Sequence, residues 1–310
     1  MTDERLAPSI PTLEGHSDYD VRWAWESGPL EEGMTAVLRV KDEAQSLPFV
    51  LPPLFEATQR VVVVDNQSTD GTPEVARTTA ERCGAADRLF VTEYPFAVSR
   101  AGSEHLATPP RSVHSLTHFY NWSFSHVTTR YSMKWDGDMV LTREGAATIA
   151  DLSWQLRSVE AVVAMPRHSL YVEDDRVAYL DLGLVNAEPW IYPMGSKYQF
   201  TKAFEWEWRA VSRDAHRIRL PEGLCVELKH LDSDEFAHWT APEDFANSSR
   251  TARKRHEWNL FHALREGRWQ ELDVVERIEA PEGTHVIDYV CDTWLPRAPR
   301  PLQRRGGSAP

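Results

Sequence analysis

The chain has 310 residues, enough for one large α/β domain or two smaller ones. Its formal net charge of −13 at pH 7 argues against nucleic-acid and anionic-membrane binding, because both ligands attract basic surfaces. The three cysteines are far apart, which argues against a disulfide framework or a zinc ribbon. The N-terminus has no signal-peptide pattern, and no apolar run approaches the roughly 18 residues of a membrane span. We therefore expect a cytoplasmic protein with no transmembrane segment and no nucleic-acid partner.

The first part of the chain alternates between strand and helix patterns. The four valines at 61–64 have no polar alternation, which is typical of a strand buried on both faces of a parallel sheet. Thr72 suits the N-cap of a helix, Pro73 its first residue and Gly84 its end. We expect strands at 34–40, 61–65 and 88–92, alternating with helices at 43–58 and 72–83. This pattern predicts an α/β fold with a doubly wound sheet.

The rest of the chain is less regular. A loop is expected at 94–112, followed by a helix at 112–127, a strand at 131–135 and a helix capped by Thr142. Beyond these we expect strands at 161–165, 177–185 and 224–229, a helix at 202–211 and a helical region at 232–265. Residues 1–33 are expected to be partly disordered, and the Pro-, Arg- and Gly-rich residues 296–310 to form a disordered tail.

Asp136-Gly137-Asp138 follows a predicted strand directly. Two carboxylates one residue apart suit Mg²⁺ or Mn²⁺, which take oxygen ligands and often use one or two protein carboxylates together with substrate phosphates. Gly137 keeps the turn tight. An ordinary acidic surface turn can have the same sequence. The position of the motif directly after an apolar strand of an α/β pattern is what favours a metal site.

Three segments together resemble the opening of family 2 glycosyltransferases, which have the GT-A fold. They are Val37 to Glu43, Val61 to Asp65, and Asn66-Gln67-Ser68-Thr69-Asp70-Gly71-Thr72. Asn121 precedes Asp136 by 15 residues, as the resemblance leads us to expect. The resemblance covers roughly residues 34–158 and implies a single GT-A domain, with a doubly wound mixed sheet and a nucleotide-sugar donor.

The resemblance also implies roles for individual residues. It puts Val40 and Lys41 in the nucleotide pocket and Asp65 and Asn66 near the base, with Asn66 standing where many members have a base-reading Asp. Because an amide both donates and accepts, the base stays open, and UDP-, GDP- and dTDP-sugars are all candidate donors. Asp138 becomes the direct metal ligand, and Asp136 lies closer to the ribose or to a metal-bound water. The nucleotide-sugar half is then 34–158, and the acceptor-binding half 159–295.

Three further assignments concern the catalytic base, a third metal ligand and a contact with the diphosphate. Members of the family are inverting, so a base must take the proton of the acceptor hydroxyl. Glu205 is our candidate, ahead of Glu207, Asp232 and Asp234. His230, after a predicted strand, is a candidate third metal ligand, although a lone histidine is more often structural. Arg100 could meet the diphosphate or be an ordinary surface arginine.

The acceptor cannot be named from the sequence. Trp190, Trp206 and Trp208 fall where it should bind, and each could stack on a sugar or fill the core. Two other functions stay open. A nucleotidyltransferase would usually carry a Gly-rich phosphate loop after the first strand, and residues 41–45 hold no glycine. A non-catalytic carbohydrate-binding protein would not need Asp136-Gly137-Asp138.

Overall fold

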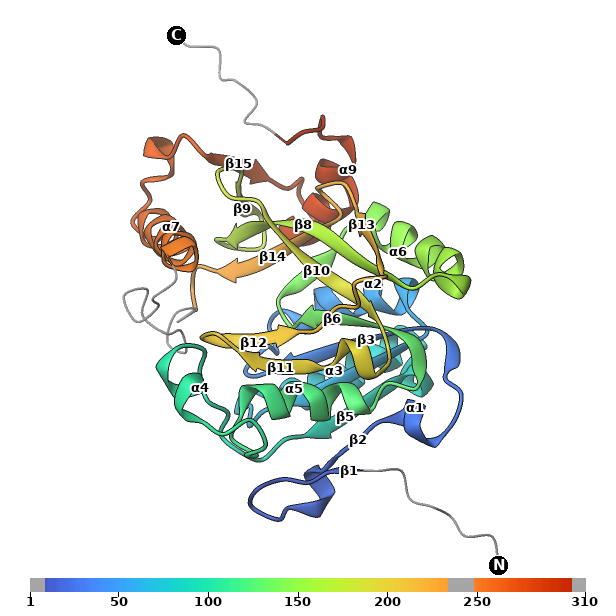
Figure 1. The fold of residues 1–310 in the computed structure, drawn as a ribbon. Helices are drawn as coiled ribbons and strands as arrows, with labels where there is room; N and C mark the ends of the chain where they lie inside the picture. Colours follow the sequence, from blue (N-terminus) through green and yellow to red (C-terminus); the bar gives the residue numbers. More distant parts are fainter. Residues whose placement is uncertain (1–8, 234–247, 303–310) are drawn as a thin grey trace, which may run out of the picture.

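The computed structural model describes residues 9–233 and 248–302. Their central feature is a mixed sheet in the order β15-β9-β8-β10-β6-β3-β4-β5, joined by β7, β13 and β14 (Figure 1). The main strands are β3 (Glu31–Val40), β4 (Arg60–Asp65), β5 (Leu89–Glu93), β6 (Thr129–Asp136), β8 (Ala161–Val172), β9 (Val177–Asp181), β10 (Asn186–Pro193) and β15 (Val275–Glu279). The additional strands are β7 (Met139–Leu141), β13 (His216–Arg219) and β14 (Cys225–His230).

Helices cover both faces of the parallel part of this sheet. Along β3, Ala36 and Leu38 face one hydrophobic cluster and Val37 faces the other, as the two-residue repeat of a strand requires. The first cluster includes α2 (Leu47–Ala57), α3 (Thr72–Arg82) and α6 (Arg143–Gln155), and the second includes α5 (Leu116–Ser125). The predicted fold class, a doubly wound mixed α/β sheet in a single domain, is confirmed.

Local signals in the sequence identify several element ends. Thr142 is the N-cap of α6, and its Oγ1 accepts a hydrogen bond from Gly145 N at 3.0 Å. Gly84 has a φ of +63° just after α3 ends. The start of α3 differs from the prediction by one residue, because Gly71 is the N-cap and Thr72 the first helical residue. Strand β8 extends seven residues beyond the expected end, to Val172.

The predicted helix at 202–211 is wrong. Strands β11 (Phe200–Ala203) and β12 (Trp206–Arg209) form a hairpin there, with Phe204 at its turn in the left-handed region at φ +64°. The alternation of aromatic and charged residues from Trp206 to Arg209 has the period of a strand, and this pattern outweighs the helix propensity of the glutamates.

The remaining differences lie in the less regular segments. The strands that were not predicted are β1 (Ser9–Ile10), β2 (Val21–Arg22), β7, β10, β13 and β15, and α4 (Ser103–Ala107) interrupts the expected loop. Helix α7 (Ser248–Arg265) covers the second part of the helical region expected at 232–265, and residues 234–247 lie outside the described residues. Within the expected tail, Ala298 and Leu302 are buried against the core, whereas 303–310 are outside the described residues. In the described part of the chain, no helix is both long and apolar enough to cross a membrane.

Candidate functional site

The strand order reverses direction between β3 and β6. From β3 the chain moves through α2 to β4 and through α3 to β5, and then crosses back by way of α5 to β6 on the other side of β3. Strands β3 and β6 are parallel, and Arg39 pairs with Asp136 where β6 ends. In open α/β sheets, ligands bind outside the carboxyl ends of strands at such a switch point. Asp136 therefore stands where this topology favours a ligand site.

A cavity of about 460 Å³ opens at this point. Its wall contains five carboxylates and three lysine side chains, together with His230 and smaller polar groups. The charged residues are Asp42, Glu43, Asp136, Asp138, Glu227, Lys41, Lys229 and Lys254. The structure thus brings together four residues selected from the sequence: Lys41, Asp136, Asp138 and His230. Carboxylates that face the cavity repel a polyanion at close range unless a cation accompanies it.

Asp136 is oriented by a buried arginine. Arg39 Nη2 donates a hydrogen bond to Asp136 Oδ1 at 3.0 Å, and only 5% of the Arg39 side chain is exposed. The guanidinium carbon lies 3.9 Å from the centre of the Tyr120 ring on α5, a favourable cation–π distance. The sequence analysis did not select Arg39. Its position in the apolar run Val37-Leu38-Arg39-Val40 could have revealed the contact, because a strand buried on both faces rarely carries an unpaired arginine.

Asp138 contacts a lysine that the sequence analysis did not select. Lys229 Nζ lies 3.0 Å from Asp138 Oδ2 and 3.2 Å from Glu227 Oε1, and 3% of its side chain is exposed. The contact follows from the antiparallel pairing of β14 with β7, in which Leu228 N donates to Asp138 O at 2.7 Å. Glu227 also pairs with the buried Arg167 of β8. No local sequence pattern reveals this contact, because it joins residues 91 positions apart.

His230 ends β14 and lines the same cavity. Its Nε2 lies 3.3 Å from Ser46 Oγ at the start of α2. Burial lowers the pKa of the His230 imidazole, and the ammonium of Lys229 lowers it further. A neutral imidazole at neutral pH is the form that binds metals.

The residues of this cavity fit a divalent cation in their chemistry. Asp136 and Asp138 offer carboxylate oxygens from the end of β6 and the turn after it, which hard cations such as Mg²⁺ and Mn²⁺ prefer. Among the described residues, however, no three His, Cys, Asp or Glu side chains gather closely enough to hold a metal ion by themselves. The predicted triad with His230 is therefore not preassembled, and two carboxylates would share the ion with ligand oxygens.

Gly137 is required by packing within this turn. A Cβ atom at this position would lie 2.8 Å from Glu43 Cγ and 2.9 Å from Val40 Cγ1. These distances are shorter than normal carbon contacts, so the turn approaches the end of β3 more closely than any other residue would allow. The glycine holds the two carboxylates of the motif against the strand end.

Asp65 and Asn66 lie at the same sheet edge, beyond the cavity wall. Asp65 is 4% exposed, and in the described part of the chain no donor reaches its Oδ1. Asn66 Nδ2 donates to Tyr94 O at 2.9 Å and to Phe96 O at 2.8 Å, so its amide fixes the loop after β5. Val40, whose carbonyl accepts from Asn66 N, is buried. The roles predicted for these residues at a nucleotide stay predictions.

Arg100 and Asn121 are located away from the described cavity wall. Arg100 is half exposed and forms a weak pair with Glu104 at 3.9 Å, as a surface arginine does. Asn121 Oδ1 accepts from Phe200 N and its Nδ2 donates to Phe200 O, both at 2.9 Å. The asparagine thus attaches the start of the β11–β12 hairpin to α5.

The two candidate bases occupy different parts of that hairpin. Glu205 follows the turn residue, and its carbonyl accepts from Gly102 N at 2.6 Å. Glu207 lies within β12 on the same face as the buried Arg209. Burial raises the pKa of the Tyr120 hydroxyl to about 12; the charge of Arg39 acts against this shift, and those of Glu207 and Asp136 add to it. Asp232 and Ser233 follow β14, and Asp234 lies outside the described residues.

The tryptophans separate clearly by burial. Trp190 is 1% exposed, and its Nε1 donates to Met165 O, so it belongs to the core. Trp208 is 52% exposed.

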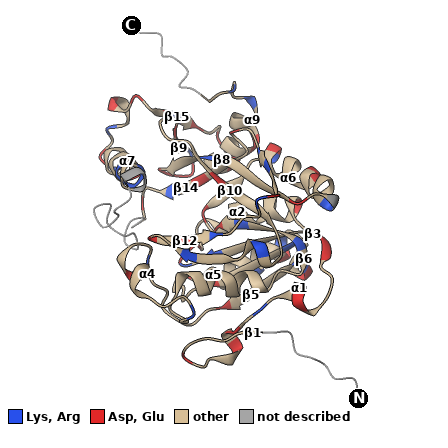
Figure 2. Ribbon diagram, viewed as in Figure 1, with Lys and Arg blue, Asp and Glu red and all other residues tan. Residues whose placement is uncertain are grey.

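Lys and Arg residues lie on the central strands as well as on the surface (Figure 2). Several of them, such as Lys134 and Arg167, lie near the Trp190 ring.

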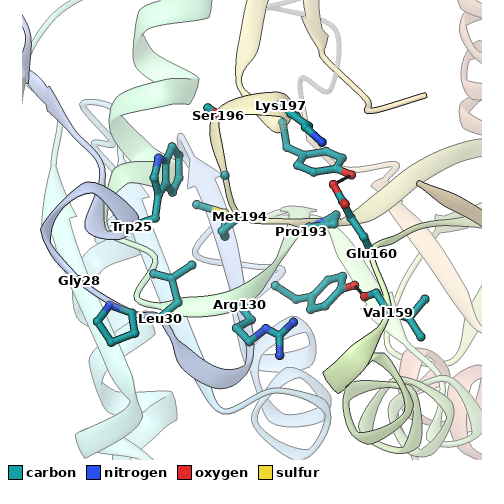
Figure 3. Close-up of a pocket in the computed structure, with 14 residues that line it drawn as sticks. Trp25, Gly28, Leu30, Arg130, Val159, Glu160, Pro193, Met194, Ser196 and Lys197 are labelled. Carbon is teal, nitrogen blue, oxygen red and sulfur yellow. Dashed lines mark hydrogen bonds between the residues drawn. The ribbon is translucent and has the colours of Figure 1, made fainter. Parts of the chain in front are cut away.

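A second cavity of about 680 Å³ lies near the start of β6, and Figure 3 shows the residues that line it. Arg130 and Tyr131 line it near the start of β6, whereas Asp136 ends that strand. Trp25, Leu30 and Met194 give it an apolar side, and Glu160 accepts a hydrogen bond from the Tyr198 hydroxyl. It lies away from the carboxyl ends of the parallel strands, so we do not assign the predicted site to it.

No family model and no curated protein matches the sequence. Among solved structures, the chain is similar to residues 1–349 of TarS from S. aureus, with 14% identity over 68% of this chain and 61% of that one and a TM-score of 0.35. It is also similar to glucosyl-3-phosphoglycerate synthase from Mycobacterium tuberculosis in complex with Mn²⁺, UDP-glucose and phosphoglyceric acid, with 14% identity over 44% of each chain and a TM-score of 0.30.

These similarities are distant. The match spans 22% of a longer TarS chain and 45% of another structure of the synthase, well under two thirds of either. At this identity and these TM-scores, neither protein assigns an activity to this chain. What the fold and the cavity define is an α/β protein with a cavity lined by charged residues at its topological switch point.

Proposed function

We propose that the chain is a glycosyltransferase of GT-A type, similar to family 2, that transfers a sugar from a nucleotide-diphosphate donor to an acceptor hydroxyl with inversion. The observation that carries this proposal is the convergence of Lys41, Asp136 and Asp138 on one cavity at the switch point of the sheet. The family resemblance in the sequence covers the strands that form this edge.

Donor binding in this proposal uses the ends of β3, β4 and β6. Val40 and Lys41 border the nucleotide, and Asp65 and Asn66 lie toward its base. Oδ1 of Asp65 accepts no hydrogen bond from the described residues, which supports this assignment because a buried carboxylate oxygen without a donor is costly.

A cytoplasmic location, inferred from the sequence, also stays a prediction.

A divalent cation, Mg²⁺ or Mn²⁺, is part of the proposal. Asp136 and Asp138 face the space that a diphosphate would enter, so a diphosphate is favoured there when a cation accompanies it. Asp136 and Asp138 would hold the ion, and His230 stands beside them in the wall. When bound, the cation supplies charge neutralisation for the leaving diphosphate.

The transfer itself needs a base. The acceptor oxygen forms a bond to the anomeric carbon as the bond from that carbon to the diphosphate oxygen breaks, and the hydroxyl proton passes to a carboxylate. The sequence favoured Glu205. The geometry of the hairpin supports Glu207 instead, because Glu207 shares a face of β12 with Arg209, whose Nη2 donates to Ser132 Oγ of β6, the strand that ends at Asp136. We propose Glu207 as the base and keep Glu205 as its alternative.

The test is thermal melting of the protein with UDP, GDP and dTDP, each with and without Mn²⁺. A ligand present at about 100 times its Kd stabilises the folded state by about 2.7 kcal/mol. We expect a metal-dependent rise in Tm with one of the three nucleotides, which would also identify the base. If no nucleotide raises Tm with or without Mn²⁺, the donor assignment is wrong. A shift with UTP, GTP or dTTP but with no diphosphate would favour a nucleotidyltransferase.

A further inference from the structure

The Lys229 ammonium is shared between two carboxylates. Its Nζ lies 3.0 Å from Asp138 Oδ2 and 3.2 Å from Glu227 Oε1, and only 3% of the side chain is exposed. All three residues line the cavity at the switch point. The two distances are nearly equal, so both carboxylates hold the ammonium. A change at one carboxylate therefore alters how strongly Lys229 is attracted to the other.

Strand pairing brings these three side chains together. Glu227 and Lys229 are two residues apart on β14, so both point to the same face. Between them, Leu228 N donates to Asp138 O at 2.7 Å, which fixes Asp138 beside that face. The lysine side chain is a flexible four-carbon stem, so its ammonium can shift from one carboxylate to the other without a change in the backbone.

Glu227 is itself fixed by a buried arginine on the neighbouring strand. Its Oε2 pairs with Nη1 of Arg167 on β8, whereas its Oε1 faces Lys229. Burial by itself would raise the pKa of the Glu227 carboxyl, but Arg167 and then Lys229 hold that pKa well below its ordinary value. Glu227 is therefore an ionised carboxylate with one oxygen directed to the arginine and the other to the lysine.

The ion pairs continue away from the cavity. Arg167 also lies 4.0 Å from Glu188 Oε1, and the same oxygen pairs with Arg253 of α7 at 3.3 Å. Arg167 consequently keeps a carboxylate neighbour when Glu227 is replaced. The role of Glu227 at the cavity can thus be tested without leaving this buried guanidinium far from every negative charge.

We propose that Glu227 is a positioning residue for the divalent cation, because it retains the Lys229 ammonium when the cation takes Asp138. This inference deepens the proposed function and rests on its cation site. A cation at Asp138 attracts the carboxylate and repels the ammonium. If Glu227 were absent, loading the cation would deprive a buried ammonium of both of these carboxylates, which is strongly unfavourable. Glu227 makes the exchange easier, because Lys229 can move toward Oε1.

Two other roles for Glu227 lead to different results. If Glu227 acted on the cation directly, as a ligand or through its charge, its effect would not depend on Lys229. If it served only to hold β14 and β8 together, its replacement would change stability and leave the affinity for the cation as it was. A double-mutant cycle separates these roles, because it measures whether two residues act through one another.

The experiment is calorimetric titration with MnCl₂ of the wild type, Lys229→Met, Glu227→Gln and the double variant. We expect Glu227→Gln to weaken Mn²⁺ binding at least fivefold in the wild type and less than twofold in the Lys229→Met background. Glu279→Gln is the matched control, since Glu279 on β15 pairs with surface arginines and is 53% exposed, and it should change the affinity less than twofold. Circular dichroism checks that each variant is folded.

A second measurement needs no replacement of Glu227. In protein with ¹⁵N-labelled lysine, the ammonium of Lys229 is identified by the resonance that Lys229→Met removes. We expect this resonance to shift on titration with MgCl₂ and to persist at saturation, because the ammonium stays hydrogen-bonded to Glu227. A resonance that Mg²⁺ leaves unchanged, or one that it removes, would show that Glu227 does not retain the ammonium.

The outcomes separate this inference from the proposed function. Equal losses of Mn²⁺ affinity in the two backgrounds, or no loss in Glu227→Gln, would overturn the positioning role alone when the wild type binds Mn²⁺. A wild type that binds no Mn²⁺ would reject the cation site itself and this inference with it.

Discussion

Lys229 Nζ lies 3.0 Å from Asp138 Oδ2, so a buried ammonium already contacts the carboxylate that the sequence identifies as the metal ligand. Glu227 holds the same ammonium at 3.2 Å. A cation at Asp138 must therefore share this carboxylate with Lys229. The charge of Lys229 should therefore influence metal affinity. Substitutions of Asp138 and of Lys229 separate the role of the carboxylate as a metal ligand from the effect of the ammonium.

Asp138→Ala should abolish the metal-dependent nucleotide shift and turnover, because it removes one of only two carboxylates in the motif. Stability should fall by about 1–3 kcal/mol, since Lys229 keeps Glu227 but loses a buried hydrogen bond. The measurements are thermal melting with nucleotide and Mn²⁺, and nucleotide release from the donor. Asp292→Ala, which removes a half-exposed partner of Arg143, is the control and should change neither. Turnover that survives Asp138→Ala would refute the metal assignment.

Lys229→Met should raise Mn²⁺ affinity at least fivefold, because it removes a positive charge beside the proposed ligand. It should also reduce stability, because Glu227 and Asp138 lose a shared partner in a largely buried place. Calorimetric titration with MnCl₂ measures the first effect and urea denaturation the second. Unchanged or weaker Mn²⁺ binding would mean that the ion does not bind at Asp138.

The sequence revealed the parts of this site that depend on neighbours along the chain. Four valines and the following Asp65 identify a buried strand and its polar end, and Thr142 identifies the start of α6 through a hydrogen bond within one helical turn. The contact of Lys229 with Asp138 depends on the pairing of β14 with β7, which has no local sequence signal. The hairpin at 200–209 was missed because its glutamates suggested a helix, although its period of two was present in the sequence.

Lys254 gives the folded state a pH dependence that can be tested. Burial lowers the pKa of this ammonium from its ordinary value of 10.5 to about 7, with Glu257 acting against the shift and Arg253 and Lys229 adding to it. Glu227, on β14, also favours the charged form. Between about pH 7 and pH 10.5 the unfolded chain binds a proton that the folded chain lacks, so this lysine makes stability rise with pH in that window.

Lys254→Met should accordingly stabilise the protein by about 1–3 kcal/mol at pH 6, where the cost of burying the charged amine is fully present. The gain should shrink as pH rises through 7 and disappear by about 10.5. Urea denaturation across this range is the measurement, and Lys197→Met, at an exposed lysine, is the control. A gain that is constant with pH would show that Lys254 stays charged throughout.

Gly137→Ala should destabilise the fold by about 1–3 kcal/mol, because the new Cβ would lie 2.8 Å from Glu43 Cγ and 2.9 Å from Val40 Cγ1. Gly145→Ala should cost more, since its Cβ would meet the backbone oxygen of Leu224 at 2.0 Å. Gly28→Ala, with no atom within 4 Å of the added Cβ, is the control and should stay within about 0.5 kcal/mol. Denaturant midpoints measure all three, and equal losses at Gly137 and Gly28 would contradict this packing.

Glu207 and Glu205 form a matched pair for the identity of the base. Both are partly buried glutamates of one hairpin, but Glu207 shares a face of β12 with Arg209, which donates to Ser132 Oγ of β6. Glu207→Gln should lower kcat by about 10²- to 10⁴-fold, the usual contribution of a general base, and should leave nucleotide affinity within about threefold. Glu205→Gln should leave both within about threefold.

The readout is the rate of nucleotide release from the donor, measured between pH 5 and pH 9. With a carboxylate base, kcat falls at low pH, because the protonated group can no longer accept the proton of the hydroxyl. Glu207→Gln should abolish this fall, the acidic limb of the profile. If Glu205→Gln instead lost the limb and the rate, the base would lie beside the turn, as the sequence first indicated. If both variants kept them, neither glutamate would be the base, and Asp232 after β14 would become the next residue to replace.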